Sequence, residues 1–349
     1  IILFSKNIKN ILQLKILIDN IKKIINDKKY PILIDQEGGK VSRLNKIIDL
    51  SFFSQYSFGK LYSENKKLFY IVYKIYIDKV CDIFKKVGIN INTAPVLDIR
   101  RKTPNFIGNR SFSQNFKSVS KLGKLCVDLY QKNRIATVVK HIPGHGRALC
   151  DSHYKTPIIN INKNKLIKQD FNPFKKSRSL FAMTAHAVYL VYDSKNTATH
   201  SKIVLKKVIR NYINFKGIII SDDISMKSLK YKIEDNAVKA IRAGCNLVLH
   251  CNAKMNEMIR LSKVIPKIDN FTSKKTSPQT SASGQQTTTN SQAYRNSKPS
   301  SSKAESSSLQ TSSPPLETAS NTETHTQQTQ ESRFNLFLRK IVCRSPHHH

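Results

Sequence analysis

Residues 217–225 read Gly217-Ile-Ile-Ile-Ser-Asp-Asp-Ile-Ser225, an apolar run that ends in two adjacent carboxylates. The consecutive isoleucines predict a buried strand, because β-branched side chains fit a packed, pleated surface. Carboxylates at the end of so apolar a strand are costly to desolvate, so they indicate a functional site. A structural alternative stays open, since Ser221 or Asp222 could cap a helix that begins near Ile224.

Outward from this stretch, short apolar runs alternate with longer amphipathic segments from Ile1 to about Ile265. Strands that alternate with helices predict a parallel α/β sheet. The other predicted strands are Ile32–Ile34, Ile89–Val96, Thr137–Lys140, Leu180–Thr184 and Leu247–Leu249. The predicted helices are Leu12–Ile25, Glu64–Val87, Val119–Asn133, Ile203–Ile213, Glu234–Ala243 and Met255–Val264.

Polar residues follow the predicted strands in turn, namely Asp35, Asp98, His141, His186 and Asp222. Functional groups at the carboxyl ends of many parallel strands are typical of a (β/α)8 barrel, whereas a doubly wound sheet places its site at one switch point. No Gly-x-Gly-x-x-Gly follows the first strand, which counts against a dinucleotide-binding fold. The pattern therefore predicts an α/β fold of the TIM-barrel type.

A second motif is Lys140-His-Ile-Pro-Gly-His-Gly146, which Asp151-Ser-His153 follows closely. Proline and glycines predict a loop after the strand that can turn sharply. Asp151 and His153 stand two residues apart, so the carboxylate can orient and charge the imidazole. A metal site is the alternative, but Pro143 breaks any helix that would place two of these histidines on one face.

Two further segments carry weaker signals. Asp35-Gln-Glu-Gly-Gly-Lys-Val-Ser-Arg43 supplies an acid at a strand end, two glycines and an arginine that can bind a polar group. Asn92-Thr-Ala-Pro-Val-Leu-Asp-Ile99 and Ile107-Gly-Asn-Arg-Ser-Phe112 supply another strand end and Arg110. Each segment alone fits a structural turn as well as a binding role.

The formal net charge of +36, from 59 Lys and Arg against 23 Asp and Glu, raises the alternative of nucleic-acid or membrane binding. The basic residues are scattered and form no long block. Ile, Lys and Asn are abundant together, and A/T-rich codons encode all three, so we attribute the charge to compositional drift. We therefore expect no nucleic-acid partner.

The six cysteines form no Cys-x-x-Cys pair and have no histidines at zinc-ligand spacing. This usage is typical of reduced thiols in a cytoplasmic protein. No apolar run approaches the roughly 18 residues that a transmembrane helix needs. We expect no metal site and no membrane span.

Composition changes abruptly after Ile265 and divides the chain into three segments. Residues 1–265 hold nearly all the large aliphatic side chains and form the predicted barrel. Residues 266–332 are rich in Ser, Thr, Gln and Pro and cannot bury enough apolar area to offset chain entropy, which predicts disorder. Residues 333–349 form a short basic and apolar tail.

Taken in order, these motifs resemble the family 3 β-N-acetylhexosaminidases of bacterial cell-wall recycling. The resemblance runs from about Leu3 to Ile265 and rests on the segments quoted above, together with Met183-Thr-Ala-His, Ser221-Asp-Asp-Ile-Ser-Met226 and Ala243-Gly-Cys-Asn-Leu-Val-Leu-His-Cys-Asn252. Its sharpest element is Asp151-Ser-His153, which separates this branch from the family 3 β-glucosidases. The resemblance implies a single (β/α)8-like barrel whose first strand is missing before Ile1, an N-terminal truncation.

The resemblance also implies a retaining exo-β-N-acetylglucosaminidase with Asp222 as nucleophile and His153, oriented by Asp151, as general acid/base. The implied sugar-binding residues are Asp35, Arg43, Arg110, Lys140 and His141. The implied substrate is a muropeptide in which terminal GlcNAc is joined to 1,6-anhydro-MurNAc, and no metal or organic cofactor is expected. Retention needs an attacking carboxylate and a proton donor, and an imidazole exchanges protons near neutrality.

Two competing functions stay open. A GlcNAc phosphorylase fits the same residues, because a neutral His tolerates an incoming phosphate better than a carboxylate would. A decayed, non-catalytic barrel with polyanion affinity fits the charge and the unusual tail, although Asp151, His153 and Asp222 are all intact. We expect a monomer.

Overall fold

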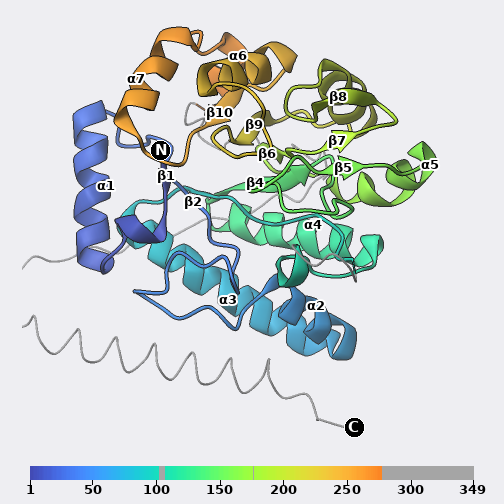
Figure 1. Ribbon diagram of the computed structural model, residues 1–349. Helices are drawn as coiled ribbons and strands as arrows, with labels where there is room; N and C mark the ends of the chain where they lie inside the picture. The colour runs from blue at the N-terminus through green and yellow to red at the C-terminus, as the bar shows by residue number, and fades with distance from the viewer. Residues whose placement is uncertain (102–106, 176, 277–349) are drawn as a thin grey trace, which may run out of the picture.

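The computed structural model describes residues 1–101, 107–175 and 177–276. Its centre is a seven-stranded sheet in the order β1-β2-β3-β4-β6-β9-β10, and every neighbouring pair is parallel. Helices pack around the outside of the sheet as it curls (Figure 1). The strands are β1 (Ile2–Leu3), β2 (Leu33–Ile34), β3 (Ile91–Asn92), β4 (Ala136–Ile142), β6 (Phe181–Thr184), β9 (Ile218–Asp223) and β10 (Leu247–Leu249).

Successive residues of the strands separate into two layers. Val138 and Phe181 pack on the inner side with other alternate strand residues, whereas Val139 and Ala182 join the large core under the helices. This division follows from the two-residue period of a strand. Lys140 stands two residues after Val138, so the same period directs it to the inner side of the sheet.

The predicted helices begin and end largely where the sequence places them, whereas α2, α5 and α8 were not predicted. They are α1 (Ile11–Ile25), α2 (Gln55–Glu64), α3 (Lys66–Val87), α4 (Phe116–Lys132), α5 (Lys163–Lys165), α6 (Ile233–Ala243), α7 (Met255–Val264) and α8 (Asn270–Thr276). Asn65 caps α3 by accepting a hydrogen bond from Leu68 N at 3.0 Å. Gly88 ends it with a φ of +90°, a conformation that favours glycine. The predicted helix 203–213 is a π-helix, η5 (Val204–Tyr212).

The expected fold, an N-terminally truncated (β/α)8-type barrel, is corrected to a curled parallel sheet, a half-barrel, in the described residues. β1 and β10 are the two ends of the strand order, and no pairing joins them within the described residues. β1 also lies ahead of the strand that the sequence places first. Its short pairing, Ile2 with Leu33 and Leu3 with Ile34, offers too brief a pattern to be recognised from periodicity.

A small second sheet joins β5 (Ile158–Ile159), β7 (Val188–Tyr189) and β8 (Asp193–Thr197). Short helical turns complete the chain: η1 (Ser5–Asn7), η2 (Gly108–Arg110), η3 (Leu166–Asp170) and η4 (Asn172–Phe174). None of the helices in the described part of the chain has the length and apolarity needed to cross a membrane.

The boundary predicted at residue 265 is too early, because α8 lies beyond it. Thr272 of α8 is fully buried and accepts a hydrogen bond from Asn246 Nδ2 at 3.0 Å. Asn246 in turn accepts from Ile219 N, so α8 contributes to the packing at the start of β9 and β10. The rest of the segment predicted to be disordered, and the tail 333–349, lie outside the described residues.

Candidate active site

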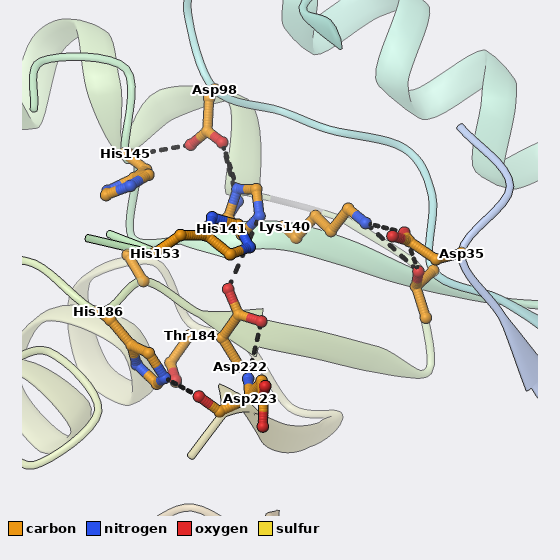
Figure 2. Close-up of polar contacts among 12 residues, drawn as sticks. Asp35, Asp98, Lys140, His141, His145, His153, Thr184, His186, Asp222 and Asp223 are labelled. Atoms are coloured by element: carbon orange, nitrogen blue, oxygen red, sulfur yellow. Dashed lines mark hydrogen bonds and ion pairs between the residues drawn. The ribbon is translucent and has the colours of Figure 1, made fainter. Parts of the chain in front are cut away.

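Lys140 is the charged centre of a cluster at the carboxyl ends of the strands (Figure 2). Its side chain is 3% exposed and forms ion pairs with Asp35 and, at 2.5 Å, with Glu37. Asp35 also accepts hydrogen bonds from Arg43 at 2.9 Å and from Thr93 at 2.7 Å. Burial alone would raise the pKa of Asp35, but the charges of Lys140 and Arg43 outweigh it and hold that pKa below its usual range.

Glu37 is a site residue that the sequence interpretation did not single out. Its side chain is 1% exposed and accepts two hydrogen bonds from Arg110, both at 2.8 Å. Such a forked pair fixes the guanidinium plane as well as its charge. Glu37 follows Asp35 by two residues, the same-face spacing of an extended chain, and that spacing was the available signal.

Asp98 orients two histidines, one at the end of β4 and one in the loop that follows it. It is fully buried, accepts a hydrogen bond from His141 Nδ1 at 2.6 Å and accepts another from the backbone N–H of His145 at 2.5 Å. Because Nδ1 donates to Asp98, His141 presents Nε2 to the cavity, 4.0 Å from Asp222 Oδ2. Asp98 therefore fixes both the tautomer and the direction of His141.

The two carboxylates that end β9 have different surroundings. Asp223 accepts hydrogen bonds from Ser225 N and Cys251 N on one oxygen and from Ser225 Oγ on the other. Asp222 accepts from Asp223 N on Oδ1 and presents Oδ2 to His141. The helix that Ser221 or Asp222 could have capped does not form, since turns follow β9 at Ile224. Asp223 holds that turn through Ser225, whereas Asp222 presents Oδ2 to His141.

Neighbouring histidines keep Asp222 ionised. Burial alone would raise its pKa, but His186 and His141 outweigh burial and hold the pKa below its usual range. His186 is itself fixed by Thr199 at 2.7 Å and by the backbone carbonyl of Asp223 at 3.0 Å. An ionised, half-buried carboxylate with one oxygen directed into a cavity is suited to nucleophilic attack.

Asp151 and His153 lie on a loop at the rim of the same cavity. His153 Nδ1 is 2.8 Å from Asp151 Oδ1, which also accepts from His153 N at 2.9 Å. The side chain of His153 is 64% exposed and that of Asp151 is 38% exposed. The predicted pairing is therefore present, on a solvent-exposed loop.

One cavity of about 160 Å³ collects all eight predicted site residues, Asp35, Arg43, Arg110, Lys140, His141, Asp151, His153 and Asp222. A larger cavity of about 970 Å³ lies at the amino ends of the strands, near Pro31 and Leu180. The described residues that line it include no Asp, Glu or His, so the chemistry favours the smaller cavity.

Residues 1–278 match the sequence model of the Glycosyl hydrolase family 3 N terminal domain. The chain belongs to glycoside hydrolase family 3. It is 33% identical over 258 residues to the β-hexosaminidase of Actinobacillus pleuropneumoniae serotype 3, covering 72% of this chain and 73% of that protein. It is 32% identical over 263 residues to the β-hexosaminidase of Haemophilus influenzae Rd, which covers 73% of this chain and 72% of that protein.

Solved structures agree with this assignment. NagZ from Neisseria gonorrhoeae superposes with a TM-score of 0.71 at 28% identity, covering 79% of this chain and 80% of that one. A family 3 β-N-acetylglucosaminidase from Paenibacillus sp. FPU-7 superposes with a TM-score of 0.68 at 27% identity. This alignment covers 75% of the present chain and 51% of the Paenibacillus protein. The predicted membership among the family 3 β-N-acetylhexosaminidases is confirmed, and the chain is a glycoside hydrolase of that class.

Within the described part of this family 3 chain, no group of three or more His, Cys, Asp or Glu is arranged to hold a metal ion. The roles of the eight predicted site residues stay predictions, because family membership does not assign them one by one. What the fold adds is their convergence: residues from 35 to 222 line one cavity.

We expect the glycosidase to lose stability as the pH falls from about 6.5 towards 4. Burial lowers the pKa of His145 to about 4, so its folded-state pKa lies below the unfolded value of roughly 6.5. Below pH 6.5 the unfolded chain binds a proton at this histidine that the native state does not bind, so the free energy of unfolding falls by about 2 kcal/mol at pH 5. Denaturant unfolding at pH 7 and pH 5 measures this loss.

The matched variants for this measurement are His145→Gln and His153→Gln. The first should reduce the difference in unfolding free energy between pH 7 and pH 5, because it removes the buried imidazole. The second replaces a ring that is 64% exposed and should leave the difference unchanged. An equal difference in all three proteins would show that His145 does not cause it.

Proposed function

We propose that the chain is a retaining exo-β-N-acetylglucosaminidase that acts through a covalent glycosyl–enzyme intermediate. The observation that carries the proposal is the carboxylate of Asp222, ionised and directed into the cavity that Asp151 and His153 border. Asp222 attacks the anomeric carbon while the bond to the leaving oxygen breaks and His153 protonates that oxygen. His153 then removes a proton from water, which attacks the same carbon and releases Asp222.

Several contacts support the sugar-binding roles. Asp35 is ionised and lies at the cavity wall, where its oxygens can accept hydrogen bonds from sugar hydroxyls. Lys140 and Arg110 are held rigidly by Glu37, so their remaining N–H groups are preorganised donors. Arg43 is bound by Asp35 and lies over the ring of Phe4. We assign these residues, with His141, to the terminal sugar.

The small size of the cavity favours one sugar residue and therefore cleavage at the end of a chain. One of the structural neighbours, Neisseria gonorrhoeae NagZ, has been solved in complex with N-trifluoroacetyl-D-glucosamine, an analogue of GlcNAc. This relationship supports terminal GlcNAc as the sugar that is bound. For the leaving group we propose the 1,6-anhydro-MurNAc of a muropeptide, and we place the enzyme in the cytoplasm as a monomer.

Phosphorolysis is the second candidate, and the exposure of His153 favours keeping it. His153 is 64% exposed, and a neutral imidazole repels an incoming phosphate less than a carboxylate in its place would. Turnover in the presence and absence of phosphate decides between the two. Release of GlcNAc 1-phosphate would support the phosphorylase, and free GlcNAc at an unchanged rate would support the hydrolase.

The decisive test is an assay of the purified protein on p-nitrophenyl β-GlcNAc, with p-nitrophenyl β-glucoside as the matched control. We expect hydrolysis of the first and a far lower rate on the second, because the glucoside lacks the acetamido group. Retention is measured by NMR, which should detect the β-anomer as the first product. No turnover of either glycoside would favour the non-catalytic barrel, and an α-anomer would overturn the covalent mechanism.

A further inference from the structure

The loop that carries His153 consists of a buried stem and an exposed tip. The stem, residues 144–148, begins at Gly144 and ends at Ala148, which is fully buried. The tip, residues 149–154, includes Leu149 and Tyr154, which are 73% and 71% exposed. The two parts differ in what holds them.

Close backbone packing fixes the start of the stem. Tyr189 donates a hydrogen bond from its hydroxyl to the carbonyl of Gly144 at 2.7 Å. Gly144 has a φ of +136°, and a Cβ added there would lie 2.7 Å from the carbonyl oxygen of Asp170. Only glycine permits this approach, so the stem and η3 are in van der Waals contact.

A buried ion-pair cluster fixes the rest of the stem. Asp170 is 2% exposed and accepts from Arg147 Nε at 2.6 Å and from Arg101 Nη2 at 3.0 Å. Arg147 donates a second hydrogen bond, to Gln169 Oε1 at 2.8 Å. Arg147 is the member of this cluster that lies on the stem, whereas Arg101 reaches Asp170 from the segment that follows β3.

The tip has weaker support. Asp151 binds its own neighbours in a turn, through hydrogen bonds from Tyr154 N and Lys155 N to its carbonyl. Beyond the tip, Thr156 donates to the carbonyl of Ser228 at 2.8 Å. The stem therefore largely sets the direction in which the tip leaves the curled sheet, and with it the position of His153 above the cavity.

We propose that Arg147, locked onto Asp170 and Gln169, is a positioning residue for the general acid/base. The proposal rests on the role assigned to His153 above. Arg147 does not border the cavity. It acts by holding the stem at one height against η3, so that His153 meets the leaving oxygen.

The test compares Arg147→Met with Arg101→Met on two substrates, 2,4-dinitrophenyl β-GlcNAc and methyl β-GlcNAc. Each variant removes one of the two arginines that pair with Asp170 and keeps the other, so both remove one positive charge from the ion-pair cluster. Only Arg147→Met releases the stem. We expect it to lower kcat/KM, which reports the glycosylation step, by about ten-fold or more on the methyl glycoside, since general acid help is worth roughly 100- to 10,000-fold. On the dinitrophenyl glycoside, whose leaving group needs little protonation, the loss of kcat/KM should stay within about three-fold.

Arg101→Met should affect both substrates alike, and Arg147→Lys should regain part of the lost rate on the methyl glycoside. In a His153→Ala background, Arg147→Met should add no further selective loss. Equal losses on both substrates for Arg147→Met, or a full additional loss in that background, would overturn the proposal. If His153→Ala itself shows no dependence on the leaving group, the assignment of His153 fails, and this inference fails with it.

Discussion

Asp222→Asn is expected to lower turnover by several orders of magnitude on every glycoside substrate. The substitution keeps the shape of the side chain, and the amide oxygen can still accept the hydrogen bond from Asp223 N that Asp222 Oδ1 accepts at 2.8 Å. What it removes is the negative charge that attacks the anomeric carbon, so the loss should appear in kcat even for dinitrophenyl glycosides. Steady-state kinetics of the wild type and the variant measure it.

Asp223→Asn is the matched control at the adjacent position. Asp223 binds Ser225 and Cys251, so its replacement should act mainly on stability. The melting temperature should fall, while the rate of glycosylation should fall far less than in Asp222→Asn. A slow 5-fluoro sugar should leave an adduct that peptide mass spectrometry locates on Asp222. An adduct on Asp223 or Asp35 would show that the nucleophile has been misassigned.

His153→Ala is expected to separate substrates by their leaving groups. A dinitrophenolate departs with little protonation, whereas the sugar alkoxide of a disaccharide needs much. Because general acid help is worth roughly 100- to 10,000-fold, the variant should nearly lose cleavage of the disaccharide and slow glycosylation by the aryl substrate far less. Deglycosylation then limits turnover, so a burst of phenolate should precede a slow steady state.

Asp151→Asn should give the same result more weakly. The imidazole stays, but it loses the carboxylate that lies 2.8 Å from Nδ1 and stabilises its cation. Stopped-flow measurement of phenolate release, together with disaccharide cleavage, covers both variants. Losses of equal size on the two substrates, with no burst, would remove His153 from the mechanism and leave Asp151 and His153 as a structural pair.

The periodicity of the sequence was sufficient for most of the sheet. Six of its strands overlap predicted apolar runs, because buried parallel strands need continuous aliphatic side chains. β1 was missed because its pairing is brief, and α8 because Asn270–Thr276 has the polar composition of the segment that follows it. The prediction of a barrel was wrong in its closure, because the pairing that would join the two end strands is a long-range property that the local pattern does not contain.

The site was predicted as a set of strand ends, and among its internal pairs only that of Asp151 with His153 was predicted. Asp98 was noted after its strand, but its contact with His141, 43 residues away, depends on how β3 and β4 align. Glu37 lay in a segment that also fits a turn, so its forked pair with Arg110 required the fold. The distinction between Asp222 and Asp223 depends on the end of β10, where Cys251 N binds only the second acid.

The division of the His153 loop into stem and tip separates packing against the core, which the stem provides, from contact with the leaving group, which the tip provides. The tip lies between fixed points at Ala148 and Thr156, and most of its surface faces solvent. The exposed side chains Leu149 and Tyr154 can therefore be exchanged without opening the core, provided that Asp151 and His153 keep their places. Such exchanges give access to new acceptors and leaving groups, while the curled sheet, the nucleophile and the terminal-sugar contacts stay unchanged.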